Sequence, residues 1–192
     1  MQSRVLVDAN VWYSRTLTDW VSKLSAFSGM YTVLWTEDVL AEARYHLRKD
    51  KPDVGDGPLT TRFDRIRDLF PEGRVSGYEI TDKEHPDRHD WHVVSAAISA
   101  KADYLLTSDK KFMDLQNHSA VDTWCFEVHN PDTFFDLVHE SSSQLVKAVT
   151  RDEFNYWILG RRSDRSLSDM LHRAGAPEFA QRVGEYVREL SR

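Results

Sequence analysis

The stretch that decides the fold is DRHDWHVVSAAISAKADYLLTSDKKF, residues 87–112. Apolar residues recur with helical spacing from Val93 onward, and they predict a helix that begins just after Asp90. The run Tyr104–Leu106 is too short for a helix but typical of a fully buried parallel strand, and Asp109 follows it closely. Because ligands bind at the carboxyl ends of strands in open α/β sheets, this stretch indicates a site with acids from both of its ends.

Short apolar runs elsewhere in the chain alternate with segments of helical periodicity. Strands are predicted at residues 4–7 and 31–35 and, more weakly, at 75–80 and 121–128. A helix is predicted over residues 37–49, with Thr36 as its cap. This alternation, without any hairpin signal, predicts a three-layer α/β/α fold around a central parallel sheet.

The last quarter of the chain has a different pattern. Three serines at 141–143 interrupt the alternation, and the residues beyond them show helical periodicity with no strand. We therefore expect an α/β domain over residues 1–140 and a small all-helical appendage over residues 141–192.

Composition limits the class of protein. The chain has 192 residues and a net charge of −6, which argues against a protein that coats nucleic acid by bulk charge. Cys125 is the only cysteine, so an internal disulfide is impossible, and its apolar neighbours predict that it is buried. No run approaches the roughly 18 apolar residues that a membrane helix needs, and none resembles a signal peptide. We expect a cytoplasmic protein with no membrane association.

Carboxylates stand at several places that a parallel sheet would bring together. Asp8 and Asp109 each follow a predicted strand, where a turn residue or a helix cap is the simpler explanation. Glu42 lies at the border of the apolar face of its helix, where pairing with a histidine one turn later is the structural alternative. Asp90 opens the central helix, and Asp87 competes with it for the role of helix cap.

Four such carboxylates cannot crowd together unless a positive charge lies between them, because like charges at short range would take up protons. Oxygen ligands alone favour Mg²⁺ or Mn²⁺ over zinc. A site of this kind suits hydrolysis of a phosphodiester, since the metal polarises the phosphoryl oxygen and lowers the pKa of the attacking water.

Four ordered motifs give the chain a family resemblance. They are VLVDANVW at 5–12, VLAEARYHL at 39–47, DWHVVSAAISAKADYLLTSDKKF at 90–112 and NPDTFFDLV at 130–138. In this order, over roughly residues 3–140, the chain resembles the PIN-domain ribonucleases, in particular the VapC-type toxins of bacterial toxin–antitoxin pairs. The helical tail is similar to the extra C-terminal region of some longer VapC-like proteins.

The resemblance implies a role for each matching residue. Asp8, Glu42, Asp90 and Asp109 match the acidic quartet, of which the three aspartates would hold the metal and Glu42 would act through water. Asn10 and Thr107 match accessory polar positions near the quartet. Asp87 is not matched in this way, and we expect it to be either the helix cap or an accessory acid just outside the ligand set.

The resemblance also implies an activity and partners. It predicts a Mg²⁺- or Mn²⁺-dependent endoribonuclease that cuts tRNA or rRNA and so inhibits translation. It further predicts a homodimer and a small antitoxin protein that blocks the site. Cations flanking the acids are candidate RNA contacts, although each has an alternative as a solvated surface charge: Arg44, Arg48, Lys110 and Lys111.

Other functions remain open at this level. His85, His89 and His92 suggest a transition-metal site, and the pair His89-Asp90 suggests a phosphohydrolase of the HD type, which would need an all-helical frame. A haloacid-dehalogenase-like site would need an acid where Asn10 stands, and a receiver domain would need paired acids before Asp8. A catalytically inactive PIN-like RNA-binding or scaffold protein is the non-enzymatic alternative.

Overall fold

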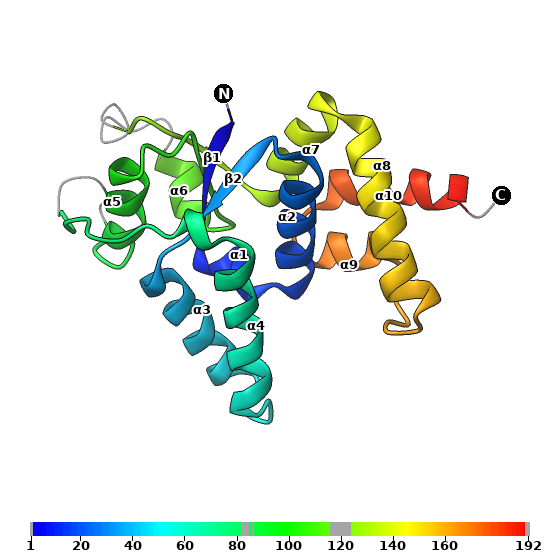
Figure 1. Ribbon diagram of the computed structural model, residues 1–192, viewed down its shortest axis with the longest axis horizontal. Coiled ribbons are helices and arrows are strands. Elements are labelled where there is room, and N and C mark those ends of the chain that lie inside the picture. The colour runs from blue at the N-terminus through cyan, green and yellow to red at the C-terminus, as the bar shows by residue number, and fades with distance from the viewer. Residues whose placement is uncertain (1, 82–84, 86, 116–123, 191–192) are drawn as a thin grey trace. The chain divides into compact units, whose positions relative to one another are not determined.

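The computed structural model describes residues 2–81, 85, 87–115 and 124–190. Its described residues form two compact units, one of residues 1–13 and 30–129 and one of residues 14–29 and 130–192. The first unit contains a sheet of four parallel strands in the order β2-β1-β3-β4, of which β1 and β2 are labelled in Figure 1. The strands are β1 (Ser3–Val7), β2 (Tyr31–Leu34), β3 (Tyr104–Leu106) and β4 (Glu127–His129).

The two central strands are apolar along their length because both of their faces are covered. Val5, Leu6 and Val7 of β1 are fully buried, as are Leu105 and Leu106 of β3. The register pairs Val7 with Leu106, so both strands end at the same edge of the sheet. The residues that follow these strands are therefore neighbours, and these residues include Asp8 and Thr107.

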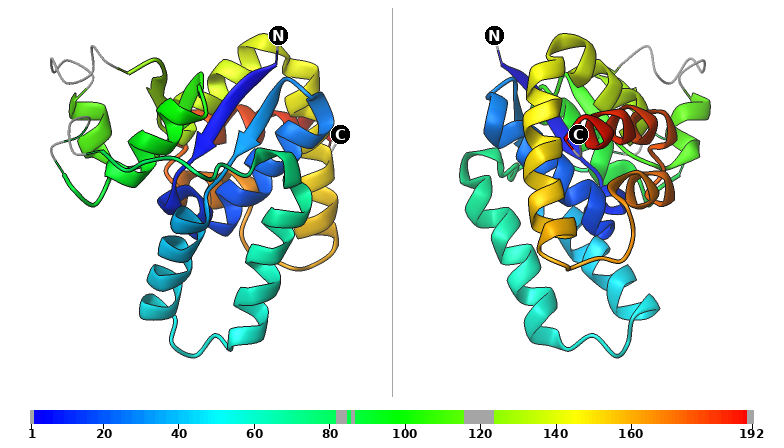
Figure 2. Two further views of the ribbon diagram at one scale, coloured as in Figure 1. Left: turned by 60° about the vertical axis from the view of Figure 1, so that its left-hand side comes forward. Right: turned by 90° about the vertical axis from the view of Figure 1, so that its right-hand side faces the viewer.

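Helices connect the strands of this unit. They are α1 (Ala9–Tyr13), α3 (Glu37–Asp50), α4 (Asp56–Leu69), α5 (Trp91–Ser99) and α6 (Lys110–Asp114), with a short 3₁₀ turn, η1 (Pro71–Gly73). Thr36 caps α3, as predicted, by accepting a hydrogen bond from the Val39 N–H at 3.0 Å. Figure 2 shows α3 and α4 side by side as a helical hairpin. The helix predicted to begin after Asp90 is confirmed as α5.

Three details differ from the sequence-based expectations. Residues 75–80 form no strand, because Gly77 takes a left-handed conformation (φ 73°) that interrupts an extended chain. Just before these residues, an isolated β-bridge pairs Trp35 with Arg74. Of the strand expected at 121–128, residues 121–123 lie outside the described part, and β4 begins only at Glu127. Cys125 is exposed rather than buried, because the alternation of an extended chain turns Trp124 and Phe126 inward and the cysteine outward.

The second unit is helical in its described residues. It contains α2 (Arg15–Ser28), α7 (Pro131–Ser141), α8 (Ser143–Glu153), the π-helical turn η4 (Phe154–Leu159), α9 (Leu167–Arg173) and α10 (Pro177–Leu190). Its core contains an aromatic cluster in which the rings of Trp20 and Phe179 meet edge to face at 5.0 Å. The carboxylate of Asp132 accepts a hydrogen bond from the Phe179 N–H at 2.9 Å and so caps the start of α10.

The expected fold class, an α/β/α fold with a parallel sheet and additional C-terminal helices, is confirmed. The compact units divide the chain at other points than residue 140, because α2 and α7 belong with the C-terminal helices. The division into a domain of residues 1–140 and an appendage of 141–192 stays a prediction. Within the described residues, no helix is both long and apolar enough to cross a membrane.

Candidate active site

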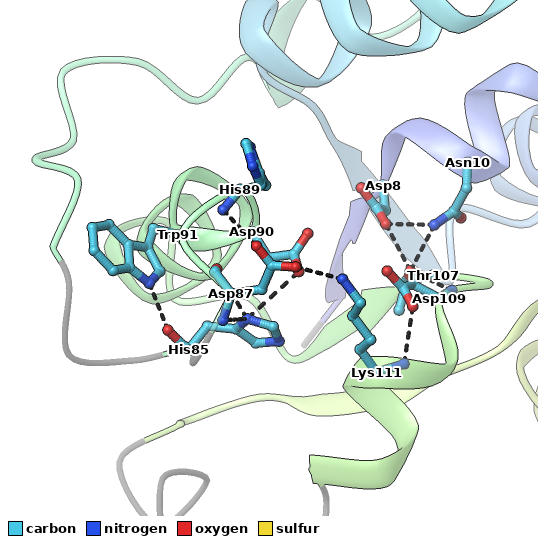
Figure 3. A network of polar contacts seen from close by, with 10 residues as sticks. All are labelled: Asp8, Asn10, His85, Asp87, His89, Asp90, Trp91, Thr107, Asp109 and Lys111. Atoms are coloured by element: carbon cyan, nitrogen blue, oxygen red, sulfur yellow. Dashed lines mark hydrogen bonds and ion pairs between the residues drawn. The ribbon is translucent and has the colours of Figure 1, made fainter.

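Asp8 is held in a network of hydrogen bonds at the ends of β1 and β3. Its Oδ2 accepts hydrogen bonds from the Thr107 hydroxyl at 2.6 Å and from the Asn10 amide at 2.7 Å, and its Oδ1 accepts one from the Ala9 N–H at 2.6 Å. The carboxyl is only 6% exposed. Burial raises its pKa, although the bonds from Thr107 and Ala9 oppose that effect. Asp8 is thus fixed in one orientation at the sheet edge (Figure 3).

Asn10 and Thr107 join the ends of the two strands. The Asn10 amide also donates to the Thr107 hydroxyl at 2.9 Å, and its Oδ1 accepts from the Ser108 N–H at 2.8 Å. The Thr107 hydroxyl accepts from the Asp109 N–H at 3.1 Å, which links Asp109 to the same network. The two accessory residues expected from the sequence therefore lie directly against Asp8.

Asp109 has two roles at the start of α6. Its Oδ1 accepts from the Lys111 N–H at 2.9 Å, so it is a helix cap. It is also one of the residues that line the pocket described below. The structural and the functional explanations of this residue are therefore compatible, because a cap uses only part of the accepting capacity of a carboxylate.

Asp90 occupies the cap position of α5 without acting as a cap. Its side chain accepts no hydrogen bond from the helix, and its Oδ2 is buried without a hydrogen-bond partner among the described residues. Burial raises the pKa of Asp90 to about 6, and Asp87, Asp8 and Asp109 add to the increase against the attraction of His85. Asp90 is partly buried, and its Oδ2 lies 3.5 Å from Nδ1 of His85 without making a hydrogen bond, so this acid is a candidate ligand rather than a structural cap.

Asp87 is held in an ion pair just before α5. Its carboxylate accepts the His89 N–H at 3.0 Å and pairs with the ammonium of Lys111, which reaches it from α6 (Figure 3). The ion pair lowers the pKa of Asp87 to about 2. Asp87 is therefore not the cap of α5, and it does not line the pocket.

Glu42 projects from α3 between two histidines. Its Oε2 lies 3.4 Å from Nε2 of His92, and its Oε1 lies 3.8 Å from Nε2 of His46. The contact with His92 is within ion-pair distance. It is not aligned as a hydrogen bond, and Nε2 of His92 has no hydrogen-bond partner among the described residues. The contact with His92 lowers the pKa of Glu42. Burial lowers the pKa of His92, but Glu42 outweighs this and the net change is upward.

The four acids expected from the sequence line one open pocket of about 320 Å³. These acids are Asp8, Glu42, Asp90 and Asp109, from the ends of β1 and β3, from α3 and from the start of α5. Sequence reasoning missed Tyr13 and Asp50, which also line the pocket; Tyr13 donates its hydroxyl to Asp50 at 3.1 Å. No periodicity could have found this pair, because it depends on contact between residues 37 positions apart.

The donor set fits a hard divalent cation, since it consists of carboxylates and includes the unsatisfied Oδ2 of Asp90. Burial is the main cause of the raised pKa of Asp90, and repulsion by Asp8 and Asp109 adds to it; a bound cation would relieve that repulsion. In the described part of the chain, no three His, Cys, Asp or Glu side chains already form a metal-binding cluster. Ion binding would therefore require the side chains of the pocket acids to move closer together.

The cations expected to contact RNA lie in different surroundings. Arg44 and Arg48 both bind Asp56, at 2.5 Å and 3.1 Å, so their charge is already partly neutralised. Lys111 pairs with Asp87, and Lys110 is exposed beside it. The lysines are thus the cations next to the acids, whereas the arginines lie along the hairpin of α3 and α4.

The proposed histidine metal site is not formed by the described residues. His85 is buried in an aromatic cluster, where its ring lies 4.6 Å from that of Phe112. Its Nδ1 accepts the Asp87 N–H at 3.0 Å. His92 instead faces Glu42, so these histidines serve packing and contact with the acids, and the sheet excludes the all-helical frame of an HD phosphohydrolase.

Comparison with known proteins agrees with this arrangement. The family model described as PIN domain matches residues 4–111, which is more than half of the chain and spans all four acids. No curated protein and no solved structure matches the chain. The chain belongs to the PIN-domain family, whose members are typically nucleases that use divalent metal ions.

Proposed function

We propose that this protein is a Mg²⁺- or Mn²⁺-dependent endoribonuclease whose active site is the pocket of Asp8, Glu42, Asp90 and Asp109. The observation that carries the proposal is the convergence of these four acids, from four separate elements, on one pocket. Structural roles explain only part of the set, because the Asp90 side chain does not cap α5 and Glu42 is not among the buried residues of α3.

Each residue has a task that follows from its surroundings. Asp8, Asp90 and Asp109 would hold the ion, and Asp8 is already oriented by Thr107 and Asn10. Glu42, whose side chain is 42% exposed, would orient the attacking water or accept its proton. The bound ion would supply charge stabilisation at the phosphoryl oxygen and a lowered pKa of water.

The substrate we propose is single-stranded or looped RNA. An open pocket at the edge of the sheet suits a chain that can bend into it, and Lys110 and Lys111 provide positive charge beside the acids. Arg44 and Arg48 would contribute only if RNA phosphate competes with Asp56 for them.

We further propose that the protein is the toxin of a VapBC-like pair that cleaves tRNA or rRNA and acts as a homodimer. The order of the motifs along the chain supports this narrower assignment. A small antitoxin could neutralise the acidic pocket with an arginine, since a guanidinium binds carboxylates through two parallel hydrogen bonds. The helices of residues 141–192 would then be a dimer contact, a substrate platform or an antitoxin docking surface.

The experiment that tests the activity is cleavage of cellular RNA by the purified protein with EDTA, Mg²⁺ or Mn²⁺. Asp8→Asn and Asp109→Asn should each lower the rate at least about 100-fold, because each removes a charged oxygen ligand. Asp53→Asn, an exposed aspartate in the loop between α3 and α4, is the control and should cleave at the wild-type rate. Equal rates for all four proteins would refute the site, and no metal-dependent cleavage by wild type would favour an inactive PIN-like RNA-binding protein.

The experiment that tests the toxin assignment is induction of the protein in bacterial cells. Growth should stop with wild type and continue with Asp109→Asn, and sequencing of the 5′ ends of RNA fragments should give one or a few cut sites in tRNA or rRNA. Cuts scattered over messenger RNA, with unimpaired growth, would contradict the assignment.

A further inference from the structure

His92 contacts Glu42 from another element. It lies in the first turn of α5, two residues after Asp90, whereas Glu42 lies in the middle of α3. The distance between His92 Nε2 and Glu42 Oε2 is 3.4 Å. The contact thus joins the helix that presents one pocket acid to the helix that presents another.

The two sides of this contact are unequally exposed. The His92 side chain is 16% exposed, while that of Glu42 is 42% exposed. Nε2 of His92 is buried, and it has no aligned hydrogen bond among the described residues, so Glu42 is the polar group toward which it is directed. Because a buried polar nitrogen without a hydrogen bond is unfavourable, a closer approach of Glu42 would stabilise this nitrogen.

His46, on the other side of Glu42, cannot serve in the same way. It lies on the same helix, one turn after Glu42, and its Nε2 is farther away at 3.8 Å. Its side chain is 48% exposed and therefore free to turn into solvent. A contact within one helix also cannot fix the position of α3 relative to α5.

We propose that His92 is a positioning residue that anchors the Glu42 carboxylate in the pocket and ties it to the helix of Asp90. A glutamate has three side-chain torsions, and an exposed one samples many rotamers. Contact with His92 at Oε2 restricts the rotamers of Glu42, so that Oε1 stays directed to the pocket. The inference rests on the proposed ribonuclease function, and it assigns no contact between His92 and the substrate.

The test compares His92→Ala with His92→Gln, whose amide can still donate to Glu42. His92→Ala should lower kcat for RNA cleavage about 10- to 100-fold, the usual range for residues that orient a ligand, with KM changed by less than about 3-fold. His92→Gln should recover most of the loss. His89→Ala is the matched control, because His89 lies in the same segment and is exposed, and it acts on Glu42 only through the weakest of the attractions that lower the pKa of that carboxyl; it should behave nearly as wild type.

A double-mutant cycle separates positioning from general damage. His92→Ala placed in a Glu42→Gln background should have no further effect on kcat, because the residue that it positions is already disabled. An equal loss in both backgrounds, or a loss in His92→Gln as large as in His92→Ala at unchanged melting temperature, would overturn the proposal.

Binding of Mn²⁺ to the metal-free protein gives a readout that does not depend on cleavage. His92→Ala should weaken binding several-fold, and His89→Ala should not. Equal Mn²⁺ affinity in His92→Ala and wild type would count against the positioning role even if RNA is not the substrate. A wild-type protein that binds Mn²⁺ but leaves RNA intact would refute the proposed function and not the role of His92.

Discussion

Replacing Asp90 with asparagine should stabilise the metal-free protein against unfolding and should largely remove the further stabilisation by a bound metal ion. The pKa of Asp90 rises from 3.8 to about 6 on folding, mainly through burial. Since one pKa unit corresponds to about 1.36 kcal/mol, the ionised carboxylate costs up to about 3 kcal/mol. Its side chain retains 18% exposure, and screening by water reduces the cost to about 2 kcal/mol. Asparagine has nearly the same shape and no charge.

The sign of the pH dependence follows from the direction of this shift. Because the pKa of Asp90 is raised in the folded state, its contribution to stability is fully present below about pH 4 and is lost as the pH rises through about 6. The advantage of Asp90→Asn should therefore be largest above pH 6, smaller at pH 5 and absent near pH 4.

The assay is urea denaturation in EDTA at pH 7.5, 5 and 4, with Asp53→Asn as an exposed control. Repeating it with Mn²⁺ at about 100 times its dissociation constant should stabilise wild type by about 2.7 kcal/mol and Asp90→Asn by much less. A metal-free Asp90→Asn protein that is less stable than wild type at pH 7.5, or a difference that does not change with pH, would refute the argument from charge burial.

Two further predictions concern stability. Gly73→Ala should destabilise the protein by about 3 kcal/mol in urea denaturation, because an added Cβ would lie 1.9 Å from the carbonyl oxygen of Val33. An unchanged urea midpoint would contradict this and show that η1 can move away from β2. Lys23→Ala should cost about 3 kcal/mol in the same assay, because Glu153 is 1% exposed and loses its partner at 2.6 Å. Glu153→Gln added to that variant should restore part of the loss, and a further loss would contradict the explanation.

Much of the first unit could be predicted from the sequence because its signals are local. The apolar run before Asp8 and the run Tyr104–Leu106 are strands with both faces buried, and they end together at one sheet edge. The position of Glu42 at the border of an apolar helical face was also readable, and it does point into the pocket. These inferences need only periodicity and the rule that parallel strands share an edge.

The features that could not be predicted depend on contacts between distant side chains. The contact of His92 with Glu42 joins helices 50 residues apart in sequence, and the ion pair of Lys111 with Asp87 removes that acid from the pocket. The membership of α2 in the second unit is of the same kind, because its apolar face is readable but its packing partner is not. The periodicity of the sequence identifies the apolar face of a helix or strand, but the residues that pack against that face are known only from the fold.

The measurement that tests the central claim most directly is the rate of cleavage of one mapped RNA as a function of Mn²⁺ concentration. Wild type and Asp109→Asn would be compared at equal protein concentration, with folding of both verified by circular dichroism. The wild-type rate should rise from zero and saturate, while Asp109→Asn stays at least about 100-fold slower at every concentration. A variant that reaches the wild-type rate, or a wild-type rate that is the same in EDTA, would contradict this prediction.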